Sequence, residues 1–376
     1  MTFKYVSINN LKIDEDLLSF INNELLKDTE ISQEKFWSGF DKSLHELAPK
    51  NRELLKKRKD LQKKIDEWHI KNKGNKIDIE VYKNFLKEID YLKKEGSDFK
   101  IETSNVDDEI TQIAGPQLVV PIMNARYTLN AANARWVSLY DSLYGTNIIE
   151  SEEGGSERYD PLRGQEVIKY VREFFDKYIP IKGTSWKNIA ALKIVDKKLI
   201  ISKDDYEYGL KDEEKFVGHR GDANKPSGVI IKNNNLHFEI IINPRAFSAA
   251  HDIAGISDVI IESAVSTICD NEDSVAAVDA KDKIICYKNW LGLMQGNLKT
   301  QFEKNGKNLE RKLNPDRSYI SKDGIGKKLH GRSLLLIRNV GHLMTNPSII
   351  LKDGTEVSEG IMDAFLTTAA ALHDLK

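Results

Sequence analysis

Apolar and charged residues alternate along the N-terminal part of the chain with the period of an α-helix. Apolar side chains recur at intervals of three and four residues within 36–47, 54–68 and 81–92. This spacing is typical of helices that pack one face against a neighbour. We therefore predict three or more amphipathic helices over residues 1–100, packed together or against another domain.

The pattern then changes to apolar runs that are each followed by a helical pattern. These runs lie at 115–124, 259–268 and 333–338. The first continues into a segment rich in alanine and leucine, from about Leu129 to Tyr144, and the last is followed by a helical pattern at 359–372. A buried strand followed by a helix is the repeating unit of an α/β barrel. The fold class predicted is therefore α/β, with three β-α units of a TIM-type barrel.

Residues 150–250 have a different secondary-structure pattern, in which one helical segment precedes several short strands. The helical pattern covers 165–178. Short strand-like runs are found at 190–195, 199–202, 228–232 and 237–242. Asn233, Asn234 and Asn235 separate the last two runs, as expected of a hairpin turn. We interpret this region as an α+β domain inserted into the barrel.

Composition and charge narrow the class of protein. The chain has 376 residues, of which 40% are hydrophobic, so it can bury a sizeable core in two or three domains. The net charge of −2 argues against a dedicated nucleic-acid or membrane-surface protein. Residues 50–64 carry eight basic and two acidic side chains. Because no aromatic residues interleave with them, a solvated helix face is favoured over a nucleic-acid-binding or partner-binding helix.

Neither a membrane span nor a disulfide framework is indicated. No apolar run approaches the roughly 18 residues that a span requires. The first residues lack the basic start and apolar core of a signal peptide. Cys269 and Cys286 are the only cysteines, too few for a disulfide framework. We therefore expect a cytoplasmic, reduced protein.

Polar residues follow each predicted barrel strand, where catalytic groups of such barrels lie. They are Asn124 to Tyr127 after the first strand, Asp270 to Ser274 after the second, and Arg338 to His342 after the third. The planar cation of Arg338 suits a carboxylate or a developing oxyanion. If the three strands are neighbours, these groups converge at one mouth.

Each of these groups also has a structural interpretation. The acidic cluster 270–274 suits magnesium, but helix starts attract Asp and Ser for capping alone. His342 is either a general base or a turn histidine. Arg311 lies in a basic turn that either clamps a phosphate or forms a surface loop. Arg126 and Tyr127 suit an adenine nucleotide, or pack at a helix start.

Four segments together resemble the malate synthase G family. They are GPQLVVPIMNARY continuing to NAANARW (115–136), EDSVAAVD (272–279), NWLGLM (289–294) and GRSLLLIRNVGHLMT (331–345). The family's enzymes depend on magnesium and condense acetyl-CoA with glyoxylate and water, giving malate and CoA in the glyoxylate cycle. The resemblance also implies a β/α barrel with an N-terminal helical clasp, an inserted α/β domain and a C-terminal plug, in a monomeric full-length protein.

Domain bounds and residue roles follow from the resemblance as expectations. The expected organisation is a helical clasp at 1–100, barrel start and linker at 101–135, inserted domain at 136–258, barrel segment at 259–296, an excursion of the inserted domain at 297–332, and barrel segment at 333–376. The expected acetyl-CoA contacts are Val119, Arg126, Tyr127, Ser274 and Arg311. Arg338 would bind glyoxylate and stabilise the enolate of acetyl-CoA. Asp270 and Glu272 would hold water bound to Mg²⁺ without contacting the ion.

The chain departs from the family in length. Family members are about twice as long, and their direct metal ligands and catalytic base lie on later barrel strands and at the plug. The resemblance therefore implies that these groups lie beyond residue 376, and that the chain needs a C-terminal half as partner. Alone, it is expected to be inactive, with weak acetyl-CoA binding without turnover as the alternative.

Overall fold

The computed structural model describes residues 4–150, 159–304 and 306–375. The chain has a mixed α/β fold that divides into two compact units. The helical unit comprises Met1–Asn105, Asp270–Asn297 and Ile337–Lys376, and the sheet unit comprises Val106–Cys269 and Leu298–Leu336.

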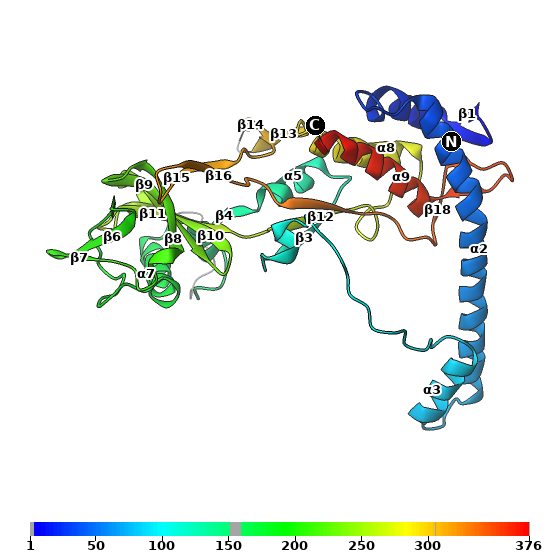
Figure 1. Ribbon diagram of the computed structural model, residues 1–376, viewed down its shortest axis with the longest axis horizontal. Helices are drawn as coiled ribbons and strands as arrows, with labels where there is room; N and C mark the ends of the chain where they lie inside the picture. Colours follow the sequence, from blue (N-terminus) through cyan, green and yellow to red (C-terminus); the bar gives the residue numbers. More distant parts are fainter. Residues whose placement is uncertain (1–3, 151–158, 305, 376) are drawn as a thin grey trace. The chain divides into compact units, whose positions relative to one another are not determined.

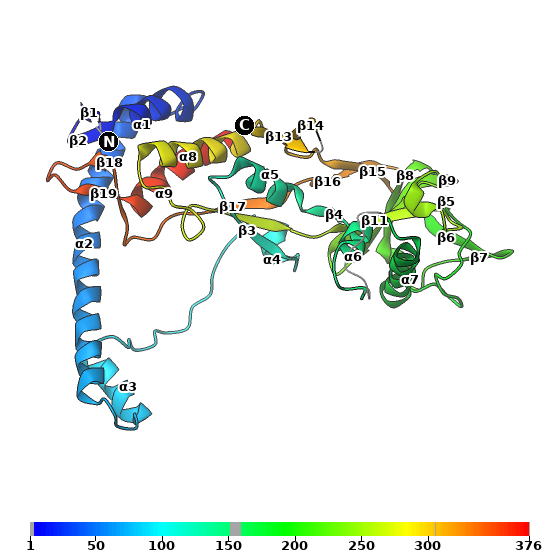
Figure 2. The same ribbon diagram turned by 180° about the vertical axis from the view of Figure 1, so that it is seen from behind.

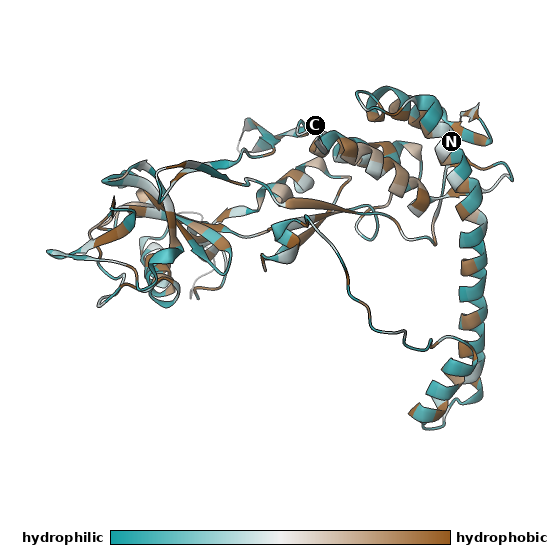
Figure 3. Ribbon diagram, in the orientation of Figure 1, coloured by the Kyte–Doolittle hydropathy of each residue, from teal (hydrophilic) through white to brown (hydrophobic). Residues whose placement is uncertain are grey.

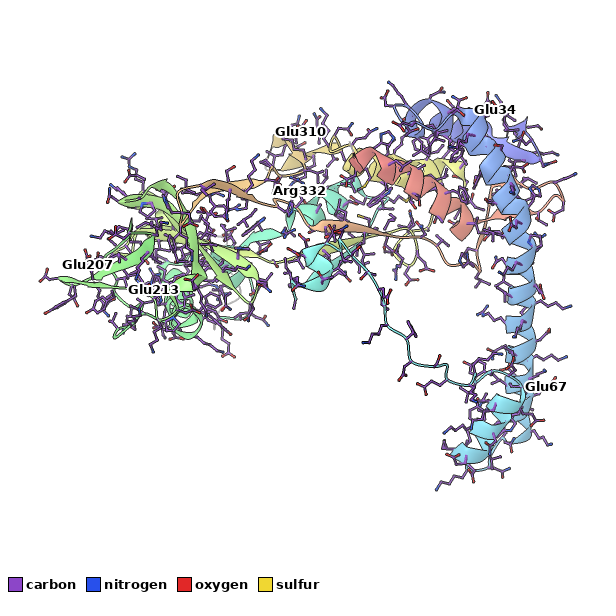
Figure 4. All side chains as sticks on the ribbon, viewed as in Figure 1. Glu34, Glu67, Glu207, Glu213, Glu310 and Arg332 are labelled. Atoms are coloured by element: carbon purple, nitrogen blue, oxygen red, sulfur yellow. The ribbon has the colours of Figure 1, made fainter. Side chains whose placement is uncertain are left out.

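A single long helix, α2 (Gln33–Lys71), dominates the N-terminal part of the helical unit. Glu34 and Glu67 mark its two ends in Figure 4. The Ser32 hydroxyl caps its start by accepting a hydrogen bond from the amide of Lys35 at 3.2 Å. The two segments predicted at 36–47 and 54–68 are thus one continuous helix, with Pro49 inside it. Hydrophobic and hydrophilic residues alternate along it in Figure 3.

The first half of α2 supplies the apolar contacts of this region. Its buried residues all precede Pro49, and they include Phe36, Phe40 and Leu44. The shorter helix α1 (Glu15–Phe20) precedes it, and α3 (Ile79–Glu88) follows it without any buried residue.

The remainder of the helical unit is a small sheet and two packed helices. Strands β1 (Tyr5–Ile8), β2 (Leu11–Asp14), β18 (Thr345–Ile350) and β19 (Glu356–Ser358) form an antiparallel sheet in that order. Residues 1–100 are therefore not helical throughout. Helices α8 (Ala280–Met294) and α9 (Glu359–Ala371) lie side by side (Figures 1 and 2). Helix α9 agrees with the helix predicted at 359–372.

The sheet unit is built around a seven-stranded sheet with the order β16-β15-β8-β9-β10-β11-β4. The strands are β4 (Trp136–Ser138), β8 (Phe216–Asp222), β9 (Lys225–Asn233), β10 (Leu236–Ile242), β11 (Ile256–Glu262), β15 (Arg317–Ser321) and β16 (Gly326–Leu329). Helix α7 (Pro161–Tyr178) contributes Val167, Val171 and Phe175 to the core, where they join Val229 and Phe238 of the sheet.

The predicted turn between 228–232 and 237–242 is confirmed. Strands β9 and β10 pair across a two-residue loop formed by Asn234 and Asn235, whose φ angles are 51° and 64°. Asparagine tolerates this left-handed backbone better than most residues, and such loops match the twist of a hairpin. Strands β5 (Ala191–Val195) and β6 (Lys198–Lys203) form a second hairpin at predicted positions.

Two sequence predictions in this unit were wrong. The helix expected from Leu129 to Tyr144 is interrupted, because Trp136–Ser138 pairs with β11 as strand β4. Helices α5 (Ala125–Asn133) and α6 (Leu139–Tyr144) lie on either side of it. The run 259–268 likewise contains two strands: β11 extends the seven-stranded sheet, whereas β12 (Ser266–Asp270) joins another sheet.

That other sheet contains the three strands predicted to begin the barrel. Its order is β17-β12-β3, with β3 at Gln117–Pro121 and β17 at Leu334–Arg338. The amide of Leu334 donates to the carbonyl of Val265, and the amide of Asn271 donates to the carbonyl of Arg338. The residue numbers increase along both strands from the first hydrogen bond to the second, so β12 and β17 run in the same direction. Closure of these strands into a barrel stays a prediction.

Across the residues that the structure describes, no helix is both long enough and apolar enough to cross a membrane.

Candidate functional site

Arg338 and Asp270 occupy the last positions of neighbouring strands in the helical unit. The Nε of Arg338 donates to Oδ1 of Asp270 at 2.7 Å, and its Nη2 donates to Oδ2 at 2.8 Å. Such a two-point contact fixes the plane of the guanidinium as well as its position. Because these bonds use Nε and Nη2, neither of them occupies Nη1. The side chain of Arg338 remains 39% exposed, whereas that of Asp270 is fully buried.

Further hydrogen bonds hold the carboxylate of Asp270. Its Oδ1 accepts from the amide of Glu272 at 2.9 Å, and its Oδ2 accepts from the amide and hydroxyl of Ser274 at 3.0 and 2.7 Å. Burial by itself raises the pKa of Asp270, but the hydrogen bonds from Arg338 and Ser274 outweigh it and hold that pKa well below its usual range. Asp270 is therefore a fixed anion at neutral pH.

Glu272 joins the segment after β12 to the segment after β17. Its Oε1 accepts from the amide of Gly341 at 3.0 Å, and its Oε2 lies 3.9 Å from the Nε of Arg338. Asp273 approaches Nη2 of Arg338 at 3.4 Å but is 80% exposed. The guanidinium is thus surrounded by carboxylates on one side.

A buried ionic network holds the backbone that follows Arg338. The Oδ2 of Asp363, on α9, accepts from the amide of Val340 at 3.1 Å. Its Oδ1 accepts from Nζ of Lys283 at 2.9 Å and from the hydroxyl of Tyr287 at 2.5 Å. Lys283 also contacts Glu359 at 2.5 Å. Each of these side chains is at least nine-tenths buried. Sequence patterns gave no signal for this network, because its members come from different helices.

The carboxylates near Arg338 suit support of a magnesium ion better than direct ligation. Oxygen donors are the right type for Mg²⁺. Both oxygens of Asp270 are already used by protein donors, however, while among the described residues Oε2 of Glu272 has only the distant Arg338 contact. Within the described ranges, no group of three or more His, Cys, Asp or Glu side chains is arranged to hold a metal ion.

Three of the predicted acetyl-CoA residues, Arg126, Tyr127 and Arg311, form a second cluster in the sheet unit. Arg126 lies 5.5 Å from the ring centre of its neighbour Tyr127 and 5.5 Å from that of Phe302. Arg311 lies 5.6 Å from the same Phe302 ring. Two cations therefore share one aromatic ring, an arrangement suited to phosphate groups and an adenine base. Tyr127 is 47% exposed and Val119, on β3, is 56% exposed.

A hairpin brings Arg311 and Phe302 to α5. Strands β13 (Lys299–Lys304) and β14 (Lys307–Lys312) pair in antiparallel fashion. Asn133, at the end of α5, donates through Nδ2 to the carbonyl of Lys312 at 2.9 Å and accepts from the amide of Asn314 at 2.8 Å. Sequence reasoning missed Phe302, because only this pairing places it between the two arginines. The Ser274 hydroxyl binds Asp270 in the helical unit, and its contact with acetyl-CoA stays a prediction.

Comparisons with known proteins agree with the resemblance seen in the motifs. The family model "Malate synthase, N-terminal domain" matches residues 16–77, and "Malate synthase G, alpha-beta insertion domain" matches residues 159–233.

Curated relatives match almost the whole chain. Malate synthase G of Corynebacterium glutamicum is 48% identical over 98% of this chain and 50% of its own length. That of Halalkalibacterium halodurans is 48% identical over 99% of this chain and 51% of its own length. The Corynebacterium efficiens protein is 46% identical over 98% and 49%, respectively. The chain thus spans about half the length of the curated relatives it matches.

Proposed function

The chain is a sequence relative of malate synthase G along almost all of its length, and we propose that it contributes the substrate-binding part of a malate synthase. The proposed reaction joins the methyl carbon of acetyl-CoA, after loss of a proton, to the aldehyde carbon of glyoxylate. Water then cleaves the thioester, which releases malate and CoA. The observation that carries the proposal is the guanidinium of Arg338, which Asp270 holds at a strand end.

Arg338 binds glyoxylate and stabilises the enolate oxygen. An α-proton of a thioester is weakly acidic, so its removal requires a positioned base and a cation near the developing oxyanion. Since Asp270 engages Nε and Nη2, Nη1 is the donor that is presented to substrate. Removing a donor of this kind costs roughly 10²–10³ in rate.

Asp270 and Glu272 keep Arg338 in a productive position. The carboxylate of Asp270 is buried and orients the guanidinium, and Glu272 ties the two strand-end segments together. When bound, magnesium would polarise the aldehyde of glyoxylate. The Oε2 of Glu272 is the carboxylate oxygen available to hydrogen-bond water around that ion.

The nucleotide part of acetyl-CoA binds at Arg126, Tyr127 and Arg311, and Val119 is a further contact of acetyl-CoA. The two arginines suit phosphate groups because guanidinium pairs with phosphate oxygens at two points. Their shared contact with Phe302 restricts both side chains before the ligand arrives.

The proposed fold places β3, β12 and β17 as the first three strands of a barrel. In the chain, β3 is followed by α5 and β12 by α8, whereas strands β18 and β19 come between β17 and α9. The order β17-β12-β3 is that of consecutive barrel strands.

The test measures both binding and turnover with the purified chain. Titration with acetyl-CoA is followed by calorimetry, and release of free CoA is followed after adding acetyl-CoA, glyoxylate and Mg²⁺. We expect saturable acetyl-CoA binding that Arg126→Gln and Arg311→Gln each weaken. Absence of any acetyl-CoA binding would overturn the proposal.

A matched variant separates the arginine cluster from general charge effects. Arg245→Gln removes an exposed arginine elsewhere in the sheet unit and should leave acetyl-CoA binding unchanged. CoA release distinguishes catalysis from the alternative function, a module that binds acetyl-CoA without turning it over.

A further inference from the structure

The peptide group between Val340 and Gly341 contacts both helix α9 and the candidate site. Its N–H, which belongs to Gly341, donates to Oε1 of Glu272 at 3.0 Å. Its carbonyl oxygen, which belongs to Val340, lies so close to Gly360 of α9 that a Cβ at that glycine would overlap it. Because a trans peptide is planar, its C=O and N–H point in opposite directions. One rigid plane therefore joins α9 to Glu272.

Glycine occupies both positions at which a side chain would crowd this plane. A Cβ at Gly341 would lie 2.9 Å from Oε1 of Glu272. A Cβ at Gly360 would meet the backbone of Val340 at a separation that real Cβ atoms do not show. Glycine is a weak helix former. The approach of Val340 therefore gives a physical reason for a glycine in the first turn of α9.

Further contacts from α9 fix the residues around this peptide. The Oδ2 of Asp363 accepts from the amide of Val340 at 3.1 Å, and the hydroxyl of Thr367 lies 3.2 Å from Oδ1 of Asn339. Asp363 is fully buried, and Lys283 donates to its other oxygen at 2.9 Å. Helix α9 thus sets the N–H of Val340 through a carboxylate and its C=O through a close backbone contact.

The segment 338–342 is also anchored at both of its ends. The carbonyl of Arg338 accepts from the amide of Asn271 at 2.9 Å. The carbonyl of His342 accepts from Nδ2 of Asn51, on α2, at 2.8 Å. A push on the central peptide is therefore relieved by rotation of its plane, because the segment as a whole is held in place.

We propose that Gly360 is a positioning residue for Glu272 and acts through the Val340–Gly341 peptide. This role rests on the proposed function, in which Glu272 hydrogen-bonds water around magnesium. The close packing at Gly360 sets the angle of the peptide plane, and that angle aims the N–H of Gly341 at Oε1 of Glu272. The other oxygen, Oε2, then lies on the side of Arg338, 3.9 Å from its Nε. Helix α9 thus controls the carboxylate of Glu272 through the backbone.

Proton–nitrogen NMR of the purified chain, prepared with isotope-labelled glycine, tests the proposal. In Gly360→Ala the amide signal of Gly341 should move upfield, because its N–H rotates away from the carboxylate. Its hydrogen exchange should accelerate roughly tenfold to a hundredfold, the effect of losing a hydrogen bond to a charged group. The chemical shift in the folded chain does not report global stability, so a purely structural role for Gly360 would leave it unchanged.

Thr368→Ala is the matched control on the same helix. Thr368 is exposed on α9, and alanine there raises helix propensity as it does at Gly360. The signal and the exchange of Gly341 should match those of the parent chain in this control. An unchanged Gly341 signal in a folded Gly360→Ala chain would overturn the proposal.

A second pair of variants follows the same link from its other end. Glu272→Gln removes the charge that Gly341 faces, and because Glu272 is 37% exposed the chain should stay folded. The amide signals of both Gly341 and Gly360 should move. In Asp273→Asn, at an 80% exposed side chain, both should stay where they are. If Gly360→Ala does not fold, this pair decides: movement at Gly341 without movement at Gly360 refutes the link.

Titration of the same proteins with acetyl-CoA distinguishes this role from the proposed function. Arg126 and Arg311 belong to the other compact unit, so Gly360→Ala should bind acetyl-CoA as tightly as the parent chain does. A parent chain that binds no acetyl-CoA overturns the proposed function, whereas the glycine signals decide the role of Gly360.

Discussion

The carboxylate of Asp270 lies edge-on to the guanidinium of Arg338, joined to it by two hydrogen bonds of 2.7 and 2.8 Å. The buried partner is the anion, and the cation projects from it with 39% of its side chain exposed. Asp270 therefore contacts Arg338 from the protein interior, and the guanidinium of Arg338 is left accessible to a ligand. A lysine would not reproduce this contact, because ammonium lacks the planar fork.

Asp270→Asn should destabilise the chain by about 1.5–3 kcal/mol, the range for hydrogen bonds to charged groups. The amide removes the charge and replaces one acceptor by a donor facing Arg338. Asp273→Asn is the matched control, since Asp273 is 80% exposed and 3.4 Å from the same guanidinium. Exposed pairs contribute about 0–1 kcal/mol. Urea unfolding at neutral pH measures both, and equal losses would contradict the role given to Asp270.

The contribution of Asp270 should also depend on pH in a defined direction. Its pKa in the folded chain is lowered, while the pKa of an unfolded Asp is about 3.9. A lowered pKa stabilises the folded state above the unfolded value, and this stabilisation is lost as pH falls through the folded value. The stability difference between the parent chain and Asp270→Asn should therefore be constant near neutral pH and shrink below about pH 4. A difference that grows on acidification rules this out.

Local signals in the sequence predicted many elements correctly. Helices α7 and α9 follow from apolar periodicity, and the Asn234–Asn235 turn follows from side chains that tolerate left-handed backbone. Strand β4 was missed because its three residues become a strand only by pairing with β11, more than a hundred residues later in the chain. Strand pairing between residues so far apart in the sequence leaves no pattern in the neighbouring residues that would predict the strand.

In the candidate site, too, local sequence signals predicted some residues, whereas others are placed by contacts between distant elements. Asp270 and Arg338 were expected together because both end an apolar run, and they are joined by hydrogen bonds. Phe302 and Asp363 were not expected, since each acquires its place from contacts between separate elements. Side chains that support a site from a neighbouring helix or hairpin carry no spacing that marks them.

Asp363→Asn and Glu359→Gln should differ sharply, although both change a carboxylate that contacts Lys283. Asp363 accepts from three donors, so its loss should cost about 3–5 kcal/mol, as for a broken buried ion pair. Burial raises the pKa of Glu359, and although Lys283 opposes the rise, the pKa stays above its usual value. Its charge thus costs stability at neutral pH, and Glu359→Gln should cost less than about 1 kcal/mol.

The pH dependence gives the Glu359 prediction a second check. With a raised folded pKa, the stability of the parent chain declines as pH rises from about 4.3 through that pKa. Glu359→Gln should therefore become more stable relative to the parent chain over the same rise. Thermal unfolding at several pH values measures this. Equal losses in the two variants at neutral pH would refute the distinction.

Phe302→Ala should weaken acetyl-CoA binding about tenfold, because it removes the ring that restrains Arg126 and Arg311. Ile320→Ala is the control, since Ile320 lies on β15 of the same unit and is 39% exposed. Calorimetric titration with acetyl-CoA compares the two. The expected loss in Phe302→Ala is an affinity change with unchanged stoichiometry, and equal affinities would remove Phe302 from the site.

Gly360→Ala and Gly39→Ala should have opposite effects on stability. A Cβ at Gly360, on α9, would lie 2.3 Å from the carbonyl oxygen of Val340, so the backbone after Arg338 must move. Overpacking of this kind costs about 1–3 kcal/mol. Gly39 is inside α2 with nothing within 4 Å of its Cβ position. Alanine there should stabilise the chain by about 0.5–1 kcal/mol, because glycine is the weaker helix former.

Urea unfolding of the two glycine variants gives the sign of each change, and hydrogen exchange locates it. In Gly360→Ala the amide of Val340 should exchange faster, because the shift separates it from Asp363. In Gly39→Ala that amide should keep its protection. The expected coupling is steric: a methyl group on α9 would meet the carbonyl of Val340 and shift the backbone segment that follows Arg338. Unchanged exchange at Val340 in a destabilised Gly360→Ala chain would show that the helix yields instead of the strand end.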